Sequence, residues 1–401
     1  MAIDNKDKKV LKSSIEREQN EVACSAECEK IKGSKNLNVP HLRFPEFSGE
    51  WNKYTINDLA TVVGGGTPDT TVKSYWGGDI QWFTPSEIGK NKYVDFSKRT
   101  ITRDGLDNSS AKLLPLHTIL LSSRATVGEC SIASNECTTN QGFQSLIAKQ
   151  CNIDFLYYLI QTKKKDLIRN ACGSTFLEIS ANEIRKIKVA VPVQNEQEQI
   201  AKLLSLIDER IATQNKIIEK LQSLIKGLAA QLTQSGTPNI RLCDCLECHS
   251  STLQENCVSV TGSYPVYGAT GLIGYTNNYA YNGESILIVK DGSGVGSLSY
   301  VNDHFSVIGT LNYLTAKENY SILYLYYALM AFNFTPYITG MAIPHIYFKD
   351  YGKAKLFYPS IEKRIRIASL LHNIEQKLVV EQNLVISLSA QKSYLLRMLF
   401  I

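Results

Sequence analysis

Two glycine-rich segments have the residue types that could bind phosphate groups. Gly292-Ser293-Gly294-Val295-Gly296 follows an apolar run, as nucleotide-binding loops do. The next residues, 298–301, form another strand-like run instead of the helix whose N-terminus would hold a phosphate. A hairpin turn is therefore favoured over a cofactor loop. Gly64-Gly65-Gly66-Thr67-Pro68 is likewise expected to be a turn, one that would permit close approach to a phosphate backbone.

One cluster of cysteines and a histidine could bind zinc: Cys243, Cys245, Cys248 and His249, with Cys257 nearby. Structural zinc sites use two ligand pairs set well apart, which this spacing does not provide. Free thiols are the favoured interpretation, also for Cys24 and Cys28, because the first 20 residues lack the apolar segment of a secretory signal. We therefore expect no metal site and a cytoplasmic protein.

The sequence lacks the motifs of DNA-modifying enzymes. It has no Asn/Asp-Pro-Pro-aromatic run, no Walker-type Gly-x-x-x-x-Gly-Lys-Ser/Thr and no Asp…Glu-x-Lys nuclease cluster. The net charge of +5 permits nucleic-acid binding without establishing it. Residues 237–358 even carry 6 Lys and Arg against 8 Asp and Glu. No run of about 18 apolar residues predicts a membrane span. Function must therefore be inferred from the organisation of the chain.

The chain contains an internal repeat with an offset of 167 positions. Each half has the same order: a strand- and turn-rich block, a basic strand ending in proline, and a long helix. Strands are expected at residues 79–83, 118–122, 285–289 and 353–358, and equivalent short helices at 153–164 and 320–332. The pattern predicts an α+β fold with two tandem strand-rich domains.

Both long helices have a heptad pattern of apolar residues, which is typical of a coiled-coil seam. The first seam comprises Ile200, Leu204, Ile207, Ile211, Gln214, Ile218, Leu221, Ile225, Leu228 and Leu232. The second comprises Ile367, Leu371, Ile374, Leu378, Glu381, Val385, Leu388, Leu395 and Leu399, with Lys392 as a further polar position. Asn195 is expected to mark the entry of the first helix, and Ser235-Gly236-Thr237-Pro238 its exit.

Two such helices predict an antiparallel coiled coil that separates the two domains with pseudo-two-fold symmetry. Each helix would span roughly 50 Å. With Ile200 opposite Leu399, Gln214 would face Val385 and Ile218 would face Glu381. The alternative is that each helix packs only on its own domain. The expected boundaries are a charged mobile leader at 1–37, domains at 38–191 and 237–358, and helices at 192–236 and 359–401.

Local segments resemble the specificity subunits of type I restriction–modification systems, the HsdS family. NVPHLRFPEFSGEW (38–51) is similar to the family's opening, and TGSYPVYGATGLIGYTNNYAYNGESILI (261–288) to the start of its target-recognition domains. VPVQNEQEQIAKLLSLIDERI (191–211) resembles its domain-to-helix junction, which occurs again as YPSIEKRIRIASLLHNIEQKL (358–378).

The resemblance implies a non-catalytic DNA-specificity subunit in which each domain reads one half of a bipartite site. The implied partners are double-stranded DNA, two methyltransferase (modification) subunits and motor-nuclease (restriction) subunits, with no membrane. No cofactor would belong to this chain, because S-adenosylmethionine, ATP and Mg would be bound by the partner subunits. Two alternatives stay open: an unrecognised DNA methyltransferase or nuclease, and a coiled-coil scaffold that does not bind DNA.

Loop residues at equivalent places in the two domains are the candidates for DNA contact. Arg and Lys can pair with guanine, Gln with adenine, and hydroxyl groups can hold phosphates. Each could instead be a solvated turn residue. In the first domain the candidates are Thr67, Ser86, Lys90, Arg124, Thr126, Gln141 and Ser174. In the second they are Tyr264, Tyr267, Lys290, Ser293, His345 and Lys349.

Overall fold

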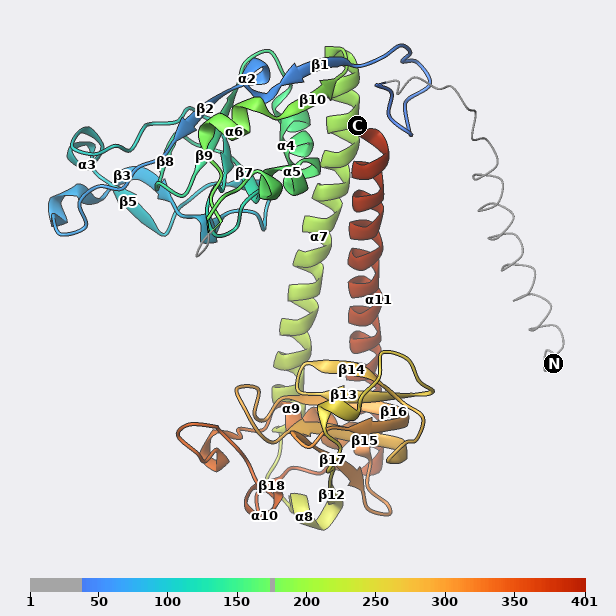
Figure 1. The fold of residues 1–401 in the computed structure, drawn as a ribbon. Helices are drawn as coiled ribbons and strands as arrows, with labels where there is room; N and C mark the ends of the chain where they lie inside the picture. Colours follow the sequence, from blue (N-terminus) through green and yellow to red (C-terminus); the bar gives the residue numbers. More distant parts are fainter. Residues whose placement is uncertain (1–37, 174–176) are drawn as a thin grey trace. The chain divides into compact units, whose positions relative to one another are not determined.

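The computed structural model describes residues 38–173 and 177–401, so the expected leader, Cys24, Cys28 and Ser174 lie outside the described residues. The chain divides into two compact units (Figure 1). The first comprises residues up to Asp208 together with Gln391–Ile401, and the second comprises Glu209–Ala390. In the described ranges, no helix combines the length and apolar character needed to cross a membrane.

The first unit contains a five-stranded sheet with a fully buried central strand. Its strands lie in the order β2 (Ala60–Gly64), β9 (Gln144–Ala148), β6 (Ile119–Leu121), β7 (Cys130–Ala133) and β4 (Tyr93–Val94). Neighbours are antiparallel except β4 and β7, which are parallel. All three residues of β6 are 0% exposed. Because side chains alternate across a strand, both faces of this sheet are covered.

A second sheet of the first unit has three strands, in the order β5 (Arg99–Ile101), β3 (Trp76–Phe83) and β8 (Cys137–Thr139). Trp82 and Ile101 form its core with Leu106 and Ala111. The remaining elements of this unit are β1 (Asn52–Thr55), α2 (Ile56–Leu59), η1 (Lys73–Tyr75), η2 (Pro85–Glu87), α3 (Arg103–Asp107), α4 (Ile153–Thr162), α5 (Lys164–Arg169), α6 (Ala181–Lys186) and β10 (Lys188–Val191). In Figure 1, α4 and α5 lie between the five-stranded sheet and the long helix α7 (Gln194–Thr233).

The second unit contains a six-stranded sheet with apolar clusters on both faces. The order is β12 (Leu246–Ser250), β17 (Leu311–Ala316), β15 (Tyr281–Val289), β16 (Leu298–Val307), β13 (Tyr264–Gly268) and β14 (Gly271–Thr276). On β15, Ile286 and Ile288 pack in the cluster that includes α9 (Ile322–Met330), whereas Leu287 and Val289 pack in the other. This alternation is the period of two expected for a strand buried on both faces.

The two units share one strand order, which confirms the internal repeat. Strands β2, β9, β6, β7 and β4 correspond in order and direction to β12, β17, β15, β16 and β13, including the parallel last pair. The other elements of the second unit are β11 (Ile240–Arg241), α8 (Leu242–Cys245), η3 (Glu255–Cys257), η4 (Thr335–Tyr337), α10 (Phe348–Tyr351) and β18 (Lys355–Leu356). The long helix α11 (Ile361–Leu399) belongs to this unit up to Ala390, and its last turns belong to the first unit. Within the described residues, the three-stranded sheet has no counterpart in this unit.

Most expected elements are present, with different ends. The expected strands at 79–83, 118–122 and 285–289 are parts of β3, β6 and β15, and the two short helices are α4 and α9. The strand expected at 353–358 is only two residues long, because β18 pairs with the two residues of β11 alone. Asn195 does not mark the helix entry: α7 begins at Gln194, where the carbonyl of Val193 accepts from the amides of Glu196 and Gln197.

The proposed seam residues all lie on the inner sides of the long helices: each of the nineteen is buried or half-buried. Asp208 on α7 pairs with Lys392 on α11 at 2.7 Å in the first unit. In the second unit the amide of Gln214 donates to the carboxylate of Glu381. The expectation that Gln214 faces Val385 and that Ile218 faces Glu381 stays a prediction, because the Asp208–Lys392 pair lies within one position of that register and a glutamine side chain can reach one helical turn along the seam. Two polar groups in an apolar seam lower their desolvation cost by bonding each other.

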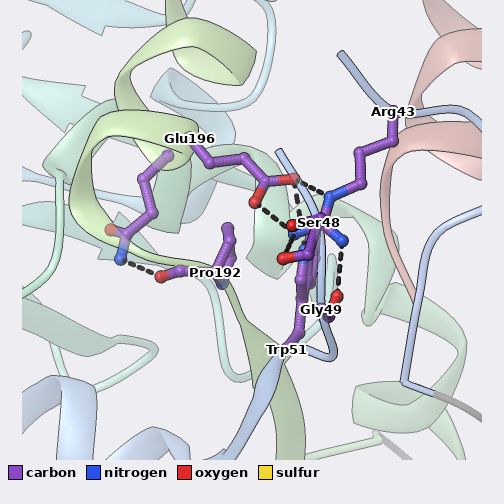
Figure 2. Close-up of polar contacts among 7 residues, drawn as sticks. Arg43, Ser48, Gly49, Trp51, Pro192 and Glu196 are labelled. Atoms are coloured by element: carbon purple, nitrogen blue, oxygen red, sulfur yellow. Dashed lines mark hydrogen bonds and ion pairs between the residues drawn. The ribbon is translucent and has the colours of Figure 1, made fainter. Parts of the chain in front are cut away.

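The junction between β10 and α7 is held by a buried carboxylate (Figure 2). Glu196 is 0% exposed, and its two oxygens accept from Nε and Nη2 of Arg43, each at 2.8 Å. The indole of Trp51 donates to the same carboxylate at 3.2 Å. The side-chain amide of the next residue, Gln197, donates to the carbonyl of Pro192 at 2.9 Å. Bidentate pairing fixes the first turn of α7 against the segment that precedes β1.

Candidate nucleic-acid interface

Four loops of the first unit converge at the ends of its strands. They follow β2, β3, β6 and β8, and backbone hydrogen bonds join them to one another. The bonds run from Gly66 N to Thr139 O at 2.9 Å, from Asn140 N to Phe83 O at 3.0 Å and from Ser123 N to Gly142 O at 2.8 Å. Loops supported in this way can present side chains on a rigid frame.

The segment 64–68 is extended and forms no turn, so that prediction was wrong. A Cβ atom on Gly65 would lie 2.0 Å from the carbonyl oxygen of Asn140, and one on Gly66 would lie 2.3 Å from the amide nitrogen of Ala111. The glycines are required because this strand end passes directly against other backbone of its own unit. Contacts within the protein therefore explain these glycines without a phosphate backbone.

Five candidates of the first unit lie on these loops. Thr67 donates its hydroxyl to the side-chain oxygen of Gln141. Ser86 and Thr126 are exposed, and each shares a hydrogen bond with a neighbouring hydroxyl, of Thr84 at 3.1 Å and of Ser122 at 3.0 Å. Lys90 is exposed and is not on these four loops. The residue before it, Gly89, donates its amide to the hydroxyl of Ser131 on β7.

The fifth loop candidate, Arg124, is part of an ion pair. Its Nε and Nη2 donate to one carboxylate oxygen of Glu178 at 3.1 and 2.6 Å. Both side chains are about two-fifths exposed, with 43% and 41% of their surfaces accessible. At such exposure water screens the attraction strongly, so the pair is exchangeable. Arg124 can therefore leave Glu178 for a phosphate or a guanine edge at small cost.

The same backbone frame occurs in the second unit with different side chains. Ile179 N donates to Ser123 O at 3.0 Å, and 167 residues later Ile346 N donates to Lys290 O at 2.9 Å. A β-bridge joins Arg124 to Glu178 in one unit, and a β-bridge joins Asp291 to His345 in the other. Adding 167 to Arg124 and Glu178 gives Asp291 and His345. An aspartate thus stands at the position of Arg124 in the second unit, and a histidine stands at the position of Glu178.

Four candidates of the second unit belong to this frame. Lys290 and Ser293 lie at the hairpin between β15 and β16, so the hairpin prediction for residues 292–296 is confirmed. His345 packs edge-on against Tyr347 with ring centroids 5.0 Å apart. The ammonium of Lys349 lies 5.0 Å from the ring centroid of the same tyrosine. Together these residues carry donors and one aromatic ring, which suits contact with bases and phosphates.

Tyr264 and Tyr267 lie elsewhere, on β13. Tyr264 packs against the rings of Tyr279 and His304, with centroids 5.0 and 5.6 Å apart. Burial, followed by the charge of Asp303, raises the pKa of Tyr267 above its ordinary value, so its hydroxyl stays protonated as a donor. The structure does not bring these two tyrosines to the hairpin frame, because β13 lies beyond β16 in the sheet.

Two residues of this frame were missed from the sequence: Glu178 and Asp291. Asp291 could have been found by applying the repeat offset to Arg124, since equivalent positions share one backbone frame. Glu178 gave no separate signal, because a single carboxylate in a loop is common. Both matter because they set the charge beside the candidate DNA contacts.

The cysteine and histidine cluster has ordinary packing roles. Burial raises the pKa of the Cys245 thiol to about 12 and that of the Cys248 thiol to about 11. His249 stacks on Tyr313 with centroids 4.7 Å apart and bonds the hydroxyl of Thr315 at 2.9 Å. Over residues 38–173 and 177–401, no group of three or more His, Cys, Asp or Glu side chains is arranged to hold a metal ion.

Two copies of one strand-rich domain, each with polar loops on an equivalent frame and each followed by a long helix, define a chain with two recognition modules. The family model described as "Type I restriction modification DNA specificity domain" matches residues 48–223 and 240–388. These residues make up more than half of the chain, which therefore belongs to this family. The membership confirms the resemblance drawn from the sequence.

Several characterised proteins and solved structures are similar to the chain. It is 39% identical over 183 residues to the type I restriction enzyme MjaIX specificity subunit of Methanocaldococcus jannaschii, a match that covers 43% of this chain and 42% of that relative. It is 25% identical over 361 residues to the EcoprrI specificity subunit of Escherichia coli, covering 81% and 87%. The fold is similar to that of the S subunit from M. genitalium, with a TM-score of 0.62 at 19% identity, covering 90% and 99%.

Proposed function

We propose that this chain is the DNA-specificity subunit of a type I restriction–modification complex and has no catalytic site of its own. Each unit reads one half of a bipartite DNA site. Methyltransferase subunits dock on the chain and methylate adenine with S-adenosylmethionine, and motor-nuclease subunits add cleavage that uses ATP and Mg. These cofactors belong to the partners, and the complex works in the cytoplasm.

One observation carries the proposal: the same hairpin frame occurs in both units with different side chains. Arg124 and Glu178 in the first unit stand where Asp291 and His345 stand in the second. An identical frame keeps the geometry of approach to DNA constant. Different donors and acceptors on it select different bases, as the major-groove pattern requires. The two units are therefore suited to two different half-sites.

A domain exchange tests this directly. Residues 237–358 are replaced by the corresponding domain of a relative, and methylated adenines are mapped across the host genome. One half of the methylated motif should change while the other half stays the same. A change in both halves together would refute the two-reader proposal.

Two single substitutions, one in each unit, form a matched pair of tests. Arg124→Gln should relax the methylated motif in the half read by the first unit only, and His345→Gln in the other half only. A good bidentate contact contributes about 1–3 kcal/mol of discrimination, so relaxation should be about fivefold or more at one base. If both variants alter the same half, the assignment of units to half-sites is wrong.

The alternatives predict other outcomes for the purified chain. A methyltransferase or nuclease would bind labelled methyl donor or cut DNA without partners. A scaffold that ignores DNA would give no gel shift, whereas a DNA reader gives a shift that weakens steeply as salt rises, because phosphate contacts release counterions.

A further inference from the structure

Each unit places tyrosine hydroxyls against a carboxylate of a long helix. In the first unit Tyr158 donates to Asp208 at 2.7 Å. In the second unit Tyr326 and Tyr327 donate to the two oxygens of Glu375 at 2.9 and 2.6 Å. Asp208 and Glu375 are 167 positions apart, so they are equivalent residues of the repeat. The surroundings of Asp208 and of Glu375 can therefore be compared residue by residue.

In the first unit this place is filled by a lysine of the chain itself. The ammonium of Lys92 lies 2.7 Å from the carboxylate of Asp154 and 2.6 Å from the hydroxyl of Ser205. It also lies 4.9 Å from the ring centroid of Tyr158, and its side chain is only 9% exposed. Asp208 is balanced separately by Lys392, 2.7 Å away. Two carboxylates are thus paired with two lysines.

In the second unit the same place is a cavity of about 540 Å³. It is lined by the equivalents of the residues that surround Lys92. By their places after the N-caps Asn152 of α4 and Ser321 of α9, Leu323 corresponds to Asp154 and Tyr326 to Tyr157. By the offset of 167, His372 corresponds to Ser205 and Glu375 to Asp208. Glu284 and Tyr300 also line the cavity, and the hydroxyl of Tyr300 donates to Glu284 at 2.5 Å. Within the described chain, neither Glu284 nor Glu375 pairs with a lysine or arginine.

The sheet edge beside the cavity is also open. In the first unit the amide of Ile132 on β7 donates to the carbonyl of Lys92 at 2.7 Å, and β4 continues along that edge. In the second unit β13 pairs with β16 only at Ser306 and Val307. Among the described strands, none pairs with that edge of β16 at residues 298–302. An extended segment can add to such an edge through backbone hydrogen bonds.

We propose that this cavity receives a lysine side chain from an extended segment of a partner protein, as the equivalent place in the first unit receives Lys92. The carboxylates of Glu284 and Glu375 supply the opposite charge, and the rings of Tyr300 and Tyr326 supply faces that attract a cation. Burial, with the Glu284 contact and charge next, raises the pKa of Tyr300, so its hydroxyl remains a donor to that carboxylate. The site concerns a protein partner and is independent of DNA reading.

The probe is a peptide with the sequence around Lys92, the residue that fills the equivalent place in the first unit. A blocked, fluorescent peptide of residues 89–95 with Lys90→Gln and Asp95→Asn keeps Lys92 as its single amine. Fluorescence polarisation measures its binding to the full-length chain. The matched control peptide has norleucine in place of Lys92. We expect the lysine peptide to bind at least tenfold more tightly, and equal affinities would overturn the proposal.

Variants of the chain locate the binding. Glu284→Gln with Glu375→Gln should weaken the lysine peptide at least tenfold, while the glutamine oxygen at 375 still accepts from one of the two tyrosines, Tyr326 or Tyr327. Should that variant unfold on thermal melting, Asn302→Trp fills the cavity from an exposed lining position and should have the same effect. Unchanged affinity in a folded variant would overturn the proposal.

The first unit supplies a positive control. Lys92→Ala removes only the side chain, because β4 still occupies that sheet edge, so this variant should bind one additional equivalent of n-butylamine at the vacated ammonium position. Carbodiimide coupling of the bound amine should then give a new amide at Asp154, located by mass spectrometry. If no additional equivalent of n-butylamine binds, the comparison between the two places fails and the proposal fails with it.

Discussion

The junction carboxylate Glu196 offers the sharpest stability test. Glu196→Ala removes the acceptor for Arg43 and Trp51 at once. The side chain of Arg43 is 14% exposed and Trp51 is 2% exposed, so water cannot replace the lost contacts fully. Breaking a buried ion pair by removing one partner costs about 3–5 kcal/mol, because the remaining charge stays desolvated. Glu196→Gln keeps acceptor atoms and should cost less, about 1–3 kcal/mol.

Tryptophan fluorescence measures the stability of the first unit, which contains Glu196. The chain has three tryptophans, Trp51, Trp76 and Trp82, and all lie in the first unit. Urea unfolding followed by this signal therefore reports the first unit without assuming that the whole chain unfolds in one step. With a urea slope of about 2–3 kcal/mol per molar, Glu196→Ala should lower the midpoint by about 1–2 M.

The control is Glu198→Ala in the same helical turn. Glu198 is exposed and accepts only from Gln194 at 3.2 Å, so its loss should change stability by less than about 0.5 kcal/mol. If Glu196→Ala and Glu198→Ala shift the midpoint equally, the buried pair does not fix the start of α7 and the reasoning is refuted.

Three further predictions concern the seam, one glycine and the buried thiols. Replacing Gln214 and Glu381 together by Leu should raise the melting temperature by several degrees in calorimetry, because both lie in an apolar seam; a decrease would contradict this. Gly65→Ala should cost several kcal/mol in urea unfolding because its Cβ would meet Asn140, whereas Gly227→Ala, with open space in α7, should stabilise by about 0.5–1 kcal/mol; similar effects would be evidence against the close approach. Burial raises the thiol pKa values of the first unit from 9.0 to about 12, so the thiolates form first in the unfolded chain and stability should fall as pH rises from about 9 to 12. Fluorescence-monitored unfolding at pH 8 and 10 checks this, and an unchanged midpoint would count against it. The thiols are Cys130, Cys137 and Cys151.

The repeat was the most informative feature of the sequence. An offset of 167 predicted two equivalent domains, and it also relates Arg124 to Asp291 within one backbone frame. Periodicity predicted the long helices because an apolar stripe of this length leaves few other structures possible. The heptads could not predict the hydrogen bond between Gln214 and Glu381, since register depends on side-chain contacts between helices.

Two differences between expectation and structure have the same origin in long-range contact. Glycines at 64–66 were expected to form a turn, but Gly65 and Gly66 are needed because backbone from around residues 110 and 140 passes directly against them. Tyr264 and Tyr267 lie in a tyrosine-rich sequence near the expected recognition loops, yet the sheet order places β13 two strands away from β15. Local sequence does not specify which strands become neighbours, so such candidates could not be separated from the hairpin residues.

The C-terminal turns of α11 complete the core of the first unit, and this affects the order in which the chain can fold. Phe400 stacks on Phe155 with centroids 5.2 Å apart and meets Trp51 edge-on at 6.4 Å. The amide of Leu42 donates to the carbonyl of Met398 at 2.8 Å. On the ribosome, the whole second unit is made before these residues emerge. The first unit therefore waits with Trp51 and Phe155 uncovered during synthesis, a state in which exposed apolar surface favours aggregation or chaperone binding.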